Sequence, residues 1–182
     1  MRLIPRSHSG FTLAETLASI AIIGLTMAAA APALGSLTRS GREAAILNQL
    51  VGSLHLARST AITRNRTVSL CPSTDGSVCT GQRWEQGWIA FVDRDTDGER
   101  APDEELLDAQ PAVEGARIPG GEYASGLSYG PTGALAPRAG GHFRLCNAGA
   151  EIASRLVVLR GNGLPALHEA DENDARSRCP AS

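Results

Sequence analysis

The 182-residue sequence contains no lysine, so all 17 basic residues are arginine, against 19 acidic residues. The formal net charge of −2 argues against a protein that coats nucleic acid indiscriminately. Aromatic residues make up only 4%, whereas 20 glycines and 10 prolines are present, which predicts a soluble part rich in loops. Charge is missing altogether from one long stretch, Thr16–Thr38.

This uncharged stretch is 23 residues long, which is enough for a helix to span the hydrocarbon core of a bilayer. Arg2, Arg6 and His8 precede it and would hold the amino terminus on the cytoplasmic side. Glu15 lies in the apolar block, one turn after Phe11. Since a lone carboxylate is costly in lipid, Glu15 needs a partner and is a functional candidate.

Two other interpretations of this segment are a secretory signal peptide and a plain single-pass anchor. The small residues Ala28–Ala31 could imitate the cleavage site of a signal peptide. A plain anchor explains neither the Gly10-Phe11 junction nor Glu15.

The junction Gly10-Phe11-Thr12-Leu13, followed by Glu15, resembles the class III leader of type IV pilins and pseudopilins. The resemblance implies that residues 1–10 are a leader, which a prepilin peptidase removes by cutting between Gly10 and Phe11. It also implies that the new amine of Phe11 is methylated and that Glu15 guides the addition of subunits to a filament.

The helix is expected to continue beyond the uncharged stretch. Between Ser40 and Thr63, apolar residues recur at helical spacing on one stripe, with Arg39, Arg42 and Arg58 outside it. We therefore predict one long helix over residues 11–64, lipid-embedded or in a filament core in its first half and packed on a globular domain in its second. Pro32 and Gly35 predict a kink or an unwound stretch.

The periodicity changes after Asn65. Arg66–Cys71 alternates as a strand and stops at Pro72, and Trp88–Val92 is a second, strongly apolar strand. Weaker strands are predicted at Glu105–Ala109, Gly126–Tyr129, His142–Cys146 and Arg155–Leu159. The fold class is therefore α+β: a long, partly transmembrane helix followed by a small antiparallel β domain over residues 65–182.

The segments Leu56–Asn65, Val68–Cys71 and Gly87–Asp93 are similar to the GspH/FimT group of pseudopilins and minor pilins. The likeness covers nearly the whole chain and is weak only from Gly161 onward. It implies a non-enzymatic structural subunit that is held in the bacterial inner membrane with its β domain in the periplasm. Such a subunit is built with other pilins or pseudopilins into a type IV pilus or a type II secretion pseudopilus.

Four cysteines behind a membrane-crossing segment indicate an oxidising compartment. Three pairings are possible, and the sequence alone does not choose between them. We predict Cys71–Cys79, which would close a short turn, and Cys146–Cys179, which would tie down a tail too poor in apolar residues to bury itself.

Asp93, Asp95, Asp97 and Glu104 have the spacing of a calcium-binding loop, with Gly98 at the sharp turn. A strand precedes them where such loops follow a helix, and Arg100 and Pro102 depart from the pattern. The alternative is a solvated acidic hairpin loop. Beyond this Ca²⁺ hypothesis no cofactor is expected.

Gly126-Leu127-Ser128-Tyr129-Gly130 matches the pattern around hydrolase nucleophiles, but that chemistry needs a helix after the serine and Pro131 follows here. We expect no enzymatic activity.

DNA binding for natural transformation is the alternative function. The segment Leu156–Arg160 resembles the strand that precedes a Gly-Arg-x-Arg motif in DNA-binding FimT-type pilins, which makes Arg160 the candidate contact. Leu164 and Ala166 stand where the two motif arginines belong, and the following tail is acidic, so DNA is disfavoured as a partner.

Overall fold

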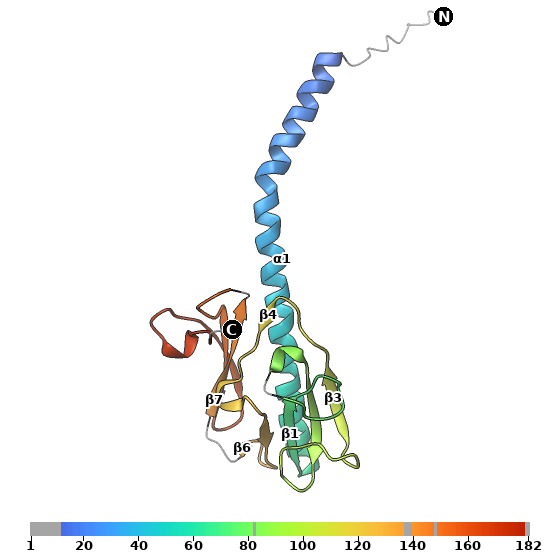
Figure 1. Cartoon of the computed structure of the whole chain (residues 1–182), viewed down its shortest axis with the longest axis vertical. Coiled ribbons are helices and arrows are strands. Elements are labelled where there is room, and N and C mark those ends of the chain that lie inside the picture. The colour runs from blue at the N-terminus through green and yellow to red at the C-terminus, as the bar shows by residue number, and fades with distance from the viewer. Residues whose placement is uncertain (1–11, 82, 137–139, 148, 181–182) are drawn as a thin grey trace, which may run out of the picture. The chain divides into compact units, whose positions relative to one another are not determined.

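The computed structural model describes residues 12–81, 83–136, 140–147 and 149–180, without the side chains of residues 29–34 and 36 (Figure 1). Helix α1 runs from Leu13 to Arg64, 52 residues, which confirms the predicted long helix over the described range. It continues across Pro32 and Gly35, so no unwound stretch interrupts it there.

The chain divides into two compact units, with the boundary inside α1 between Arg42 and Glu43. The carboxy-terminal part of the helix therefore belongs to the unit that contains all the strands. Within the described residues, no helical segment is both long enough and apolar enough to cross a membrane. The predicted span Thr16–Thr38 includes positions 29–34 and 36, whose side chains lie outside this description.

The second unit contains two antiparallel sheets. Sheet A has the order β3-β2-β1-β5-β6 and sheet B the order β4-β7-β8-β9. The strands of sheet A are β1 Thr67–Pro72, β2 Trp88–Asp93, β3 Leu106–Gln110, β5 Leu127–Tyr129 and β6 Leu135–Ala136. Those of sheet B are β4 Ala116–Arg117, β7 Gly140–Asn147, β8 Arg155–Arg160 and β9 Pro165–Glu169. Short 3-10 turns cover η1 Trp84–Gln86, η2 Gly121–Tyr123 and η3 Ala175–Ser177.

One main core joins the carboxy-terminal part of α1 to both sheets, and Figure 1 shows strands of each sheet alongside this part of the helix. Most of the predicted apolar stripe of α1 is buried, with Leu54, Ala57 and Ala61 fully covered, whereas Ala44 near its start is exposed. The small alanines allow close approach of the packed backbones. From the sheets the same core takes Val68, Leu70, Trp88, Ala90, Phe143, Leu145, Val157 and Leu159.

All six predicted strands are present, and three strands were missed. β4 and β6 are only two residues long, which is too short to show a pattern. β9 begins at Pro165 and is mostly exposed, so it lacks the apolar alternation of a buried strand. Its position in sheet B shows that the ordered domain extends beyond the point at which the family resemblance weakens.

Candidate functional site

The predicted processing site, Gly10 and Phe11, lies outside the described residues. The next residues form a capping box at the start of α1, with Thr12 as cap and Glu15 three residues later. The Thr12 backbone N–H and hydroxyl each lie 3.1 Å from Glu15 Oε2, and the Glu15 N–H donates to Thr12 Oγ1 at 3.3 Å. The side chain of Glu15 is exposed, and its carboxylate caps the helix to which Glu15 belongs.

The first unit exposes its apolar side chains on every side of the helix. Every described side chain from Thr12 to Arg42 is exposed. Eight large apolar side chains are between 55% and 79% exposed: Leu13, Leu17, Ile20, Ile22, Ile23, Leu25, Met27 and Leu37. A helix that is apolar all round is stable only when lipid or other apolar helices cover it.

Both predicted disulfides are present in the second unit, Cys71–Cys79 and Cys146–Cys179. The second bridge is not the only link that holds the tail, because backbone hydrogen bonds also join it to the loop between β7 and β8. The Ala153 N–H donates to the Ser177 carbonyl at 2.7 Å, and the Cys179 N–H donates to the Glu151 carbonyl at 2.8 Å. Backbone hydrogen bonds therefore hold the tail together with the predicted disulfide.

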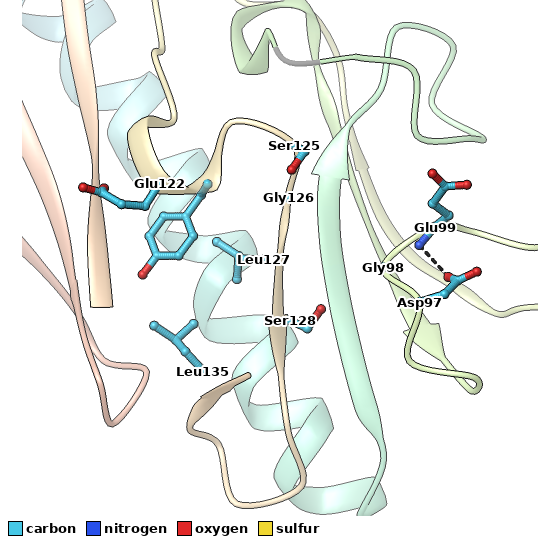
Figure 2. A pocket seen from close by; sticks show the side chains of 10 residues that line it. Asp97, Gly98, Glu99, Glu122, Ser125, Gly126, Leu127, Ser128 and Leu135 are labelled. Atoms are coloured by element: carbon cyan, nitrogen blue, oxygen red, sulfur yellow. Dashed lines mark hydrogen bonds between the residues drawn. The ribbon is translucent and has the colours of Figure 1, made fainter. Parts of the chain in front are cut away.

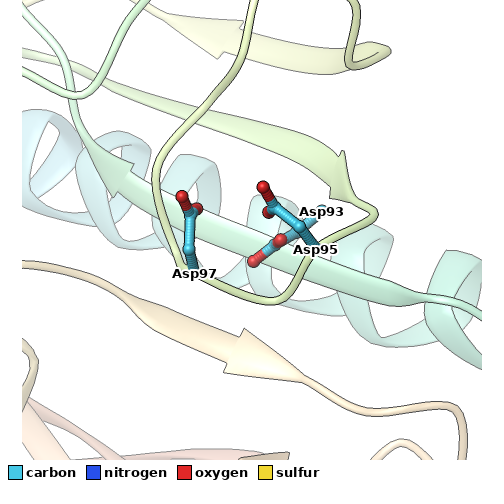
Figure 3. Close-up of side chains that lie close together, drawn as sticks. All are labelled: Asp93, Asp95 and Asp97. Carbon is cyan, nitrogen blue, oxygen red and sulfur yellow. The ribbon is translucent and has the colours of Figure 1, made fainter.

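Asp93 at the end of β2 and Asp95 and Asp97 in the loop that follows come together, as Figure 3 shows, with one carboxylate oxygen from each within 4.8 Å of the others. Glu104 is not part of this group. Its oxygens accept the backbone N–H groups of Arg94 at 2.6 Å and Ala101 at 3.0 Å. The structure therefore assembles three of the four predicted calcium ligands.

The buried member of the group, Asp93, already has hydrogen-bond donors on both oxygens. Its Oδ1 accepts the Thr96 N–H at 2.7 Å, and its Oδ2 accepts the Ser69 hydroxyl at 2.5 Å and the Gly98 N–H at 3.1 Å. A hard cation prefers such oxygens but would compete with these donors. The arrangement thus fits Ca²⁺ only in part and fits a self-capped acidic loop well.

A polar groove of about 290 Å³ lies beside β5, with Ser125 and Ser128 at its wall and Asp97 and Glu99 on the facing loop (Figure 2). The Ser128 hydroxyl lies 2.7 Å from that of Ser69, which donates to buried Asp93. Because the partner of Ser128 is another serine and no base adjoins it within the described residues, the pattern around Ser128 does not form a hydrolase site.

His142 on β7 is the buried titratable group of sheet B. Its Nδ1 and its backbone nitrogen each lie 3.1 Å from Glu122 Oε2. Burial lowers the pKa of His142, and the charges of Arg144 and Arg176 act in the same direction against the attraction of Glu122. For Glu122, burial acts to raise the pKa, but hydrogen bonds from backbone N–H groups and the charge of His142 leave it lowered.

The candidate DNA contact Arg160 is exposed at the end of β8. Among the described residues it takes part in no ion pair. Leu164 is 41% exposed in the turn that follows, so the motif positions carry an apolar surface instead of guanidinium groups.

Sequence reasoning missed the role of Arg58, which it placed outside the packed stripe of α1. The side chain is half-buried, and its Nε donates to the carbonyls of Gly133 and Asn162. It also missed the capping box, although the Thr-x-x-Glu spacing of Thr12 and Glu15 was a readable signal.

A long amino-terminal helix that continues into an antiparallel β domain is a pilin-like fold. Two solved structures share it, both of the type IV minor pilin FimU of Pseudomonas aeruginosa in different crystal forms. Their TM-scores are 0.60 and 0.56, with 20% and 21% identity. The matches cover 74% of this chain and 96% and 97% of those chains. At this identity they show the fold alone.

Two family profiles match the sequence. The profile described as type II transport protein GspH matches residues 47–163, well over half of the chain, and the prokaryotic N-terminal methylation motif matches residues 5–31. The chain belongs to the GspH family, whose members are pseudopilins and minor pilins of type II secretion and type IV pili. The comparison with curated proteins gives no match.

Proposed function

We propose that this protein is a non-enzymatic subunit that is held in the bacterial inner membrane by α1 and then assembled into a type IV pilus or a type II secretion pseudopilus. The observation that carries the proposal is the exposed apolar surface of the first unit. Covering one such side chain contributes roughly 1.5–3 kcal/mol, so eight of them favour lipid or neighbouring pilin helices strongly over water. The second unit would lie in the periplasm.

The proposal includes processing at the Gly10-Phe11 junction, in agreement with the match to the methylation motif. A prepilin peptidase removes residues 1–10, and the amine of Phe11 is methylated. Mass analysis of the amino terminus in membrane material tests this step. We expect the mature chain to begin at methylated Phe11, and a chain that still begins at Met1 would contradict the proposed cleavage.

Glu15 is proposed to neutralise the amino terminus of a neighbouring subunit during assembly, since an unpaired charge in an apolar surrounding costs several kcal/mol. The capping box provides a matched test. Glu15→Gln can keep the bond to the Thr12 N–H but loses the charge, whereas Thr12→Ala loses the cap but keeps the charge.

Cross-linking to other pilins is expected to fall strongly in the Glu15→Gln variant and to stay near the wild-type level in Thr12→Ala. The opposite result would assign Glu15 to helix capping and remove its role in subunit addition.

DNA capture is the second candidate function, and the observation that favours it is the exposed Arg160, which forms no ion pair with any described residue. Against it, Leu164 and Ala166 supply no charge and the tail carries Asp171, Glu172 and Asp174. Binding of labelled duplex DNA by the full chain in detergent should therefore be weak and should fall steeply with salt.

Replacing Leu164 and Ala166 together by arginine should raise DNA affinity. The slope of log affinity against log salt concentration should become steeper by about two, because two phosphate contacts are added. Tight binding by the unchanged protein at physiological salt, lost in Arg160→Ala, would instead establish DNA capture as a function of this subunit.

A further inference from the structure

Two turns from different sheets meet at one arginine of α1. The first turn, residues 130–134, joins β5 to β6 in sheet A, and the second, residues 161–164, joins β8 to β9 in sheet B. Arg58 Nε lies 3.0 Å from the Gly133 carbonyl oxygen and 3.3 Å from the Asn162 carbonyl oxygen. A single guanidinium thus connects the helix to both sheets.

The two turns also touch each other and the helix directly. A Cβ added at Gly163 would lie 2.2 Å from the Gly133 carbonyl oxygen, and one added at Gly133 would lie 2.6 Å from Ile62 Cδ1. The backbone φ is +77° at Gly133 and +78° at Gly163, a conformation that residues with a Cβ rarely adopt. Glycine is therefore required at both positions for the turns to approach this closely.

Each turn is closed by its own hydrogen bonds, so Arg58 is not needed to form either of them. The Gly133 N–H donates to the Gly130 carbonyl at 2.8 Å, and the Gly163 N–H donates to the Arg160 carbonyl at 2.8 Å. What Arg58 adds is a connection between two preformed turns. Because guanidinium stays charged at all working pH values, this connection is independent of pH.

We propose that Arg58 is a positioning residue that holds the β5–β6 turn and the β8–β9 turn in one arrangement and so sets the placement of sheet A against sheet B at this end of the second unit. The inference goes beyond assembly, since it concerns how the subunit fixes the turn that follows Arg160 and contains Leu164. Arg58, Gly133 and Gly163 all lie within the range that matches the GspH family.

Arg58→Met tests the proposal, because methionine keeps much of the aliphatic packing and removes the donors. Arg64→Met is the matched control: Arg64 lies on the same helix and forms an exposed ion pair with Glu105 at 2.6 Å. Amide hydrogen exchange of the full chain in detergent is the measurement, since it resolves local opening from global unfolding.

In Arg58→Met, exchange at the amides of Gly133, Gly163 and Leu164 is expected to rise about tenfold, while the amides of β1 and β2 change less than about twofold. Arg64→Met should leave all of these amides unchanged. Arg58→Lys, which can reach one carbonyl at a time, should restore protection in one turn more than in the other.

Unchanged exchange in both turns of Arg58→Met would overturn the proposal. A uniform rise across the whole second unit would overturn it as well, because that result would make Arg58 a general stabilising residue. If Arg58→Met does not fold, Arg58→Lys tests the proposal instead. Unequal protection of the two turns would support the proposal, and equal protection at the wild-type level would contradict it.

Discussion

The two units of the chain use the same kind of residue in opposite surroundings. Leu25 in the first unit is 73% exposed, whereas Leu54, further along the same helix, is fully buried. In the second unit most large apolar residues of α1 lie on one stripe that faces the sheets, although Leu56 and Ile62 are 40% and 43% exposed. In the first unit the apolar residues occupy the whole circumference of the helix. The comparison teaches that one continuous helix can serve both as part of a domain core and as a surface that needs an external partner.

The strongest test of this comparison is to shorten one leucine in each unit. Leu54→Ala removes a fully buried side chain and should lower the free energy of unfolding of the second unit by about 2–5 kcal/mol. Leu25→Ala should change it by less than about 0.5 kcal/mol. Urea unfolding followed by the fluorescence of buried Trp84 and Trp88 measures both. Equal effects of the two changes would mean that the units are not energetically distinct.

The tail of the second unit shows a different means of stabilisation from burial. Replacing Cys146 and Cys179 by serine should lower the free energy of unfolding by about 3–4 kcal/mol, since the bridge closes a long loop in the unfolded chain. Because backbone hydrogen bonds also hold the tail, the folded variant should keep the backbone amide at position 179 protected from exchange. Loss of that protection would show that the disulfide alone docks the tail.

Removal of the Cys71–Cys79 bridge is the matched control for this loss. Its sequence separation is only 8, against 33 for the other bridge, so the expected loss is smaller, about 2–3 kcal/mol.

A pH titration probes the buried polar groups of the second unit, which have no counterpart among the described side chains of the first unit. Because burial lowers the pKa of His142, the folded state takes up a proton there less readily than the unfolded chain. The free energy of unfolding should therefore fall as the pH drops below the ordinary histidine range, near 6.5. The charges of Arg144 and Arg176 lower the pKa of His142 further, whereas those of Glu122 and, more weakly, Asp174 act to raise it.

His142→Gln should flatten the dependence of stability on pH between about 7 and 5. His168→Gln on the exposed strand β9 is the control and should leave the slope as it is. A slope that survives in His142→Gln would assign the pH dependence to other groups.

The smallest expected effect concerns calcium and the acidic loop. Since Asp93 and Glu104 already accept internal hydrogen bonds, millimolar Ca²⁺ should stabilise the second unit by less than about 0.5 kcal/mol. A thermal melt with and without Ca²⁺ measures this. A large rise in Tm that disappears in Asp95→Asn would instead establish the loop as a calcium site.

Much of the fold could be predicted because its signals are local. The stripe that contains Leu50 and Leu54 has the period of a helix, and the alternation around Val68 and Leu70 has that of a strand. The candidate processing junction was readable for the same reason, since Gly10, Phe11 and Glu15 lie within six consecutive residues. β9 could not be predicted in this way, because an exposed edge strand has no apolar period.

The sequence by itself determined the long helix, the main strands and the candidate leader junction, because propensity, periodicity and short motifs act over a few residues. Only the tertiary structure decided the partners of Arg58, which lie 75 and 104 residues away along the chain, and the separation of Glu104 from the Asp93 group. The partners of Arg58 depend on how the strands are ordered into two sheets, whereas Glu104 is held by backbone N–H groups of its own loop. The physical reason is that a hydrogen bond between distant residues is set by topology and close packing, which no local pattern encodes.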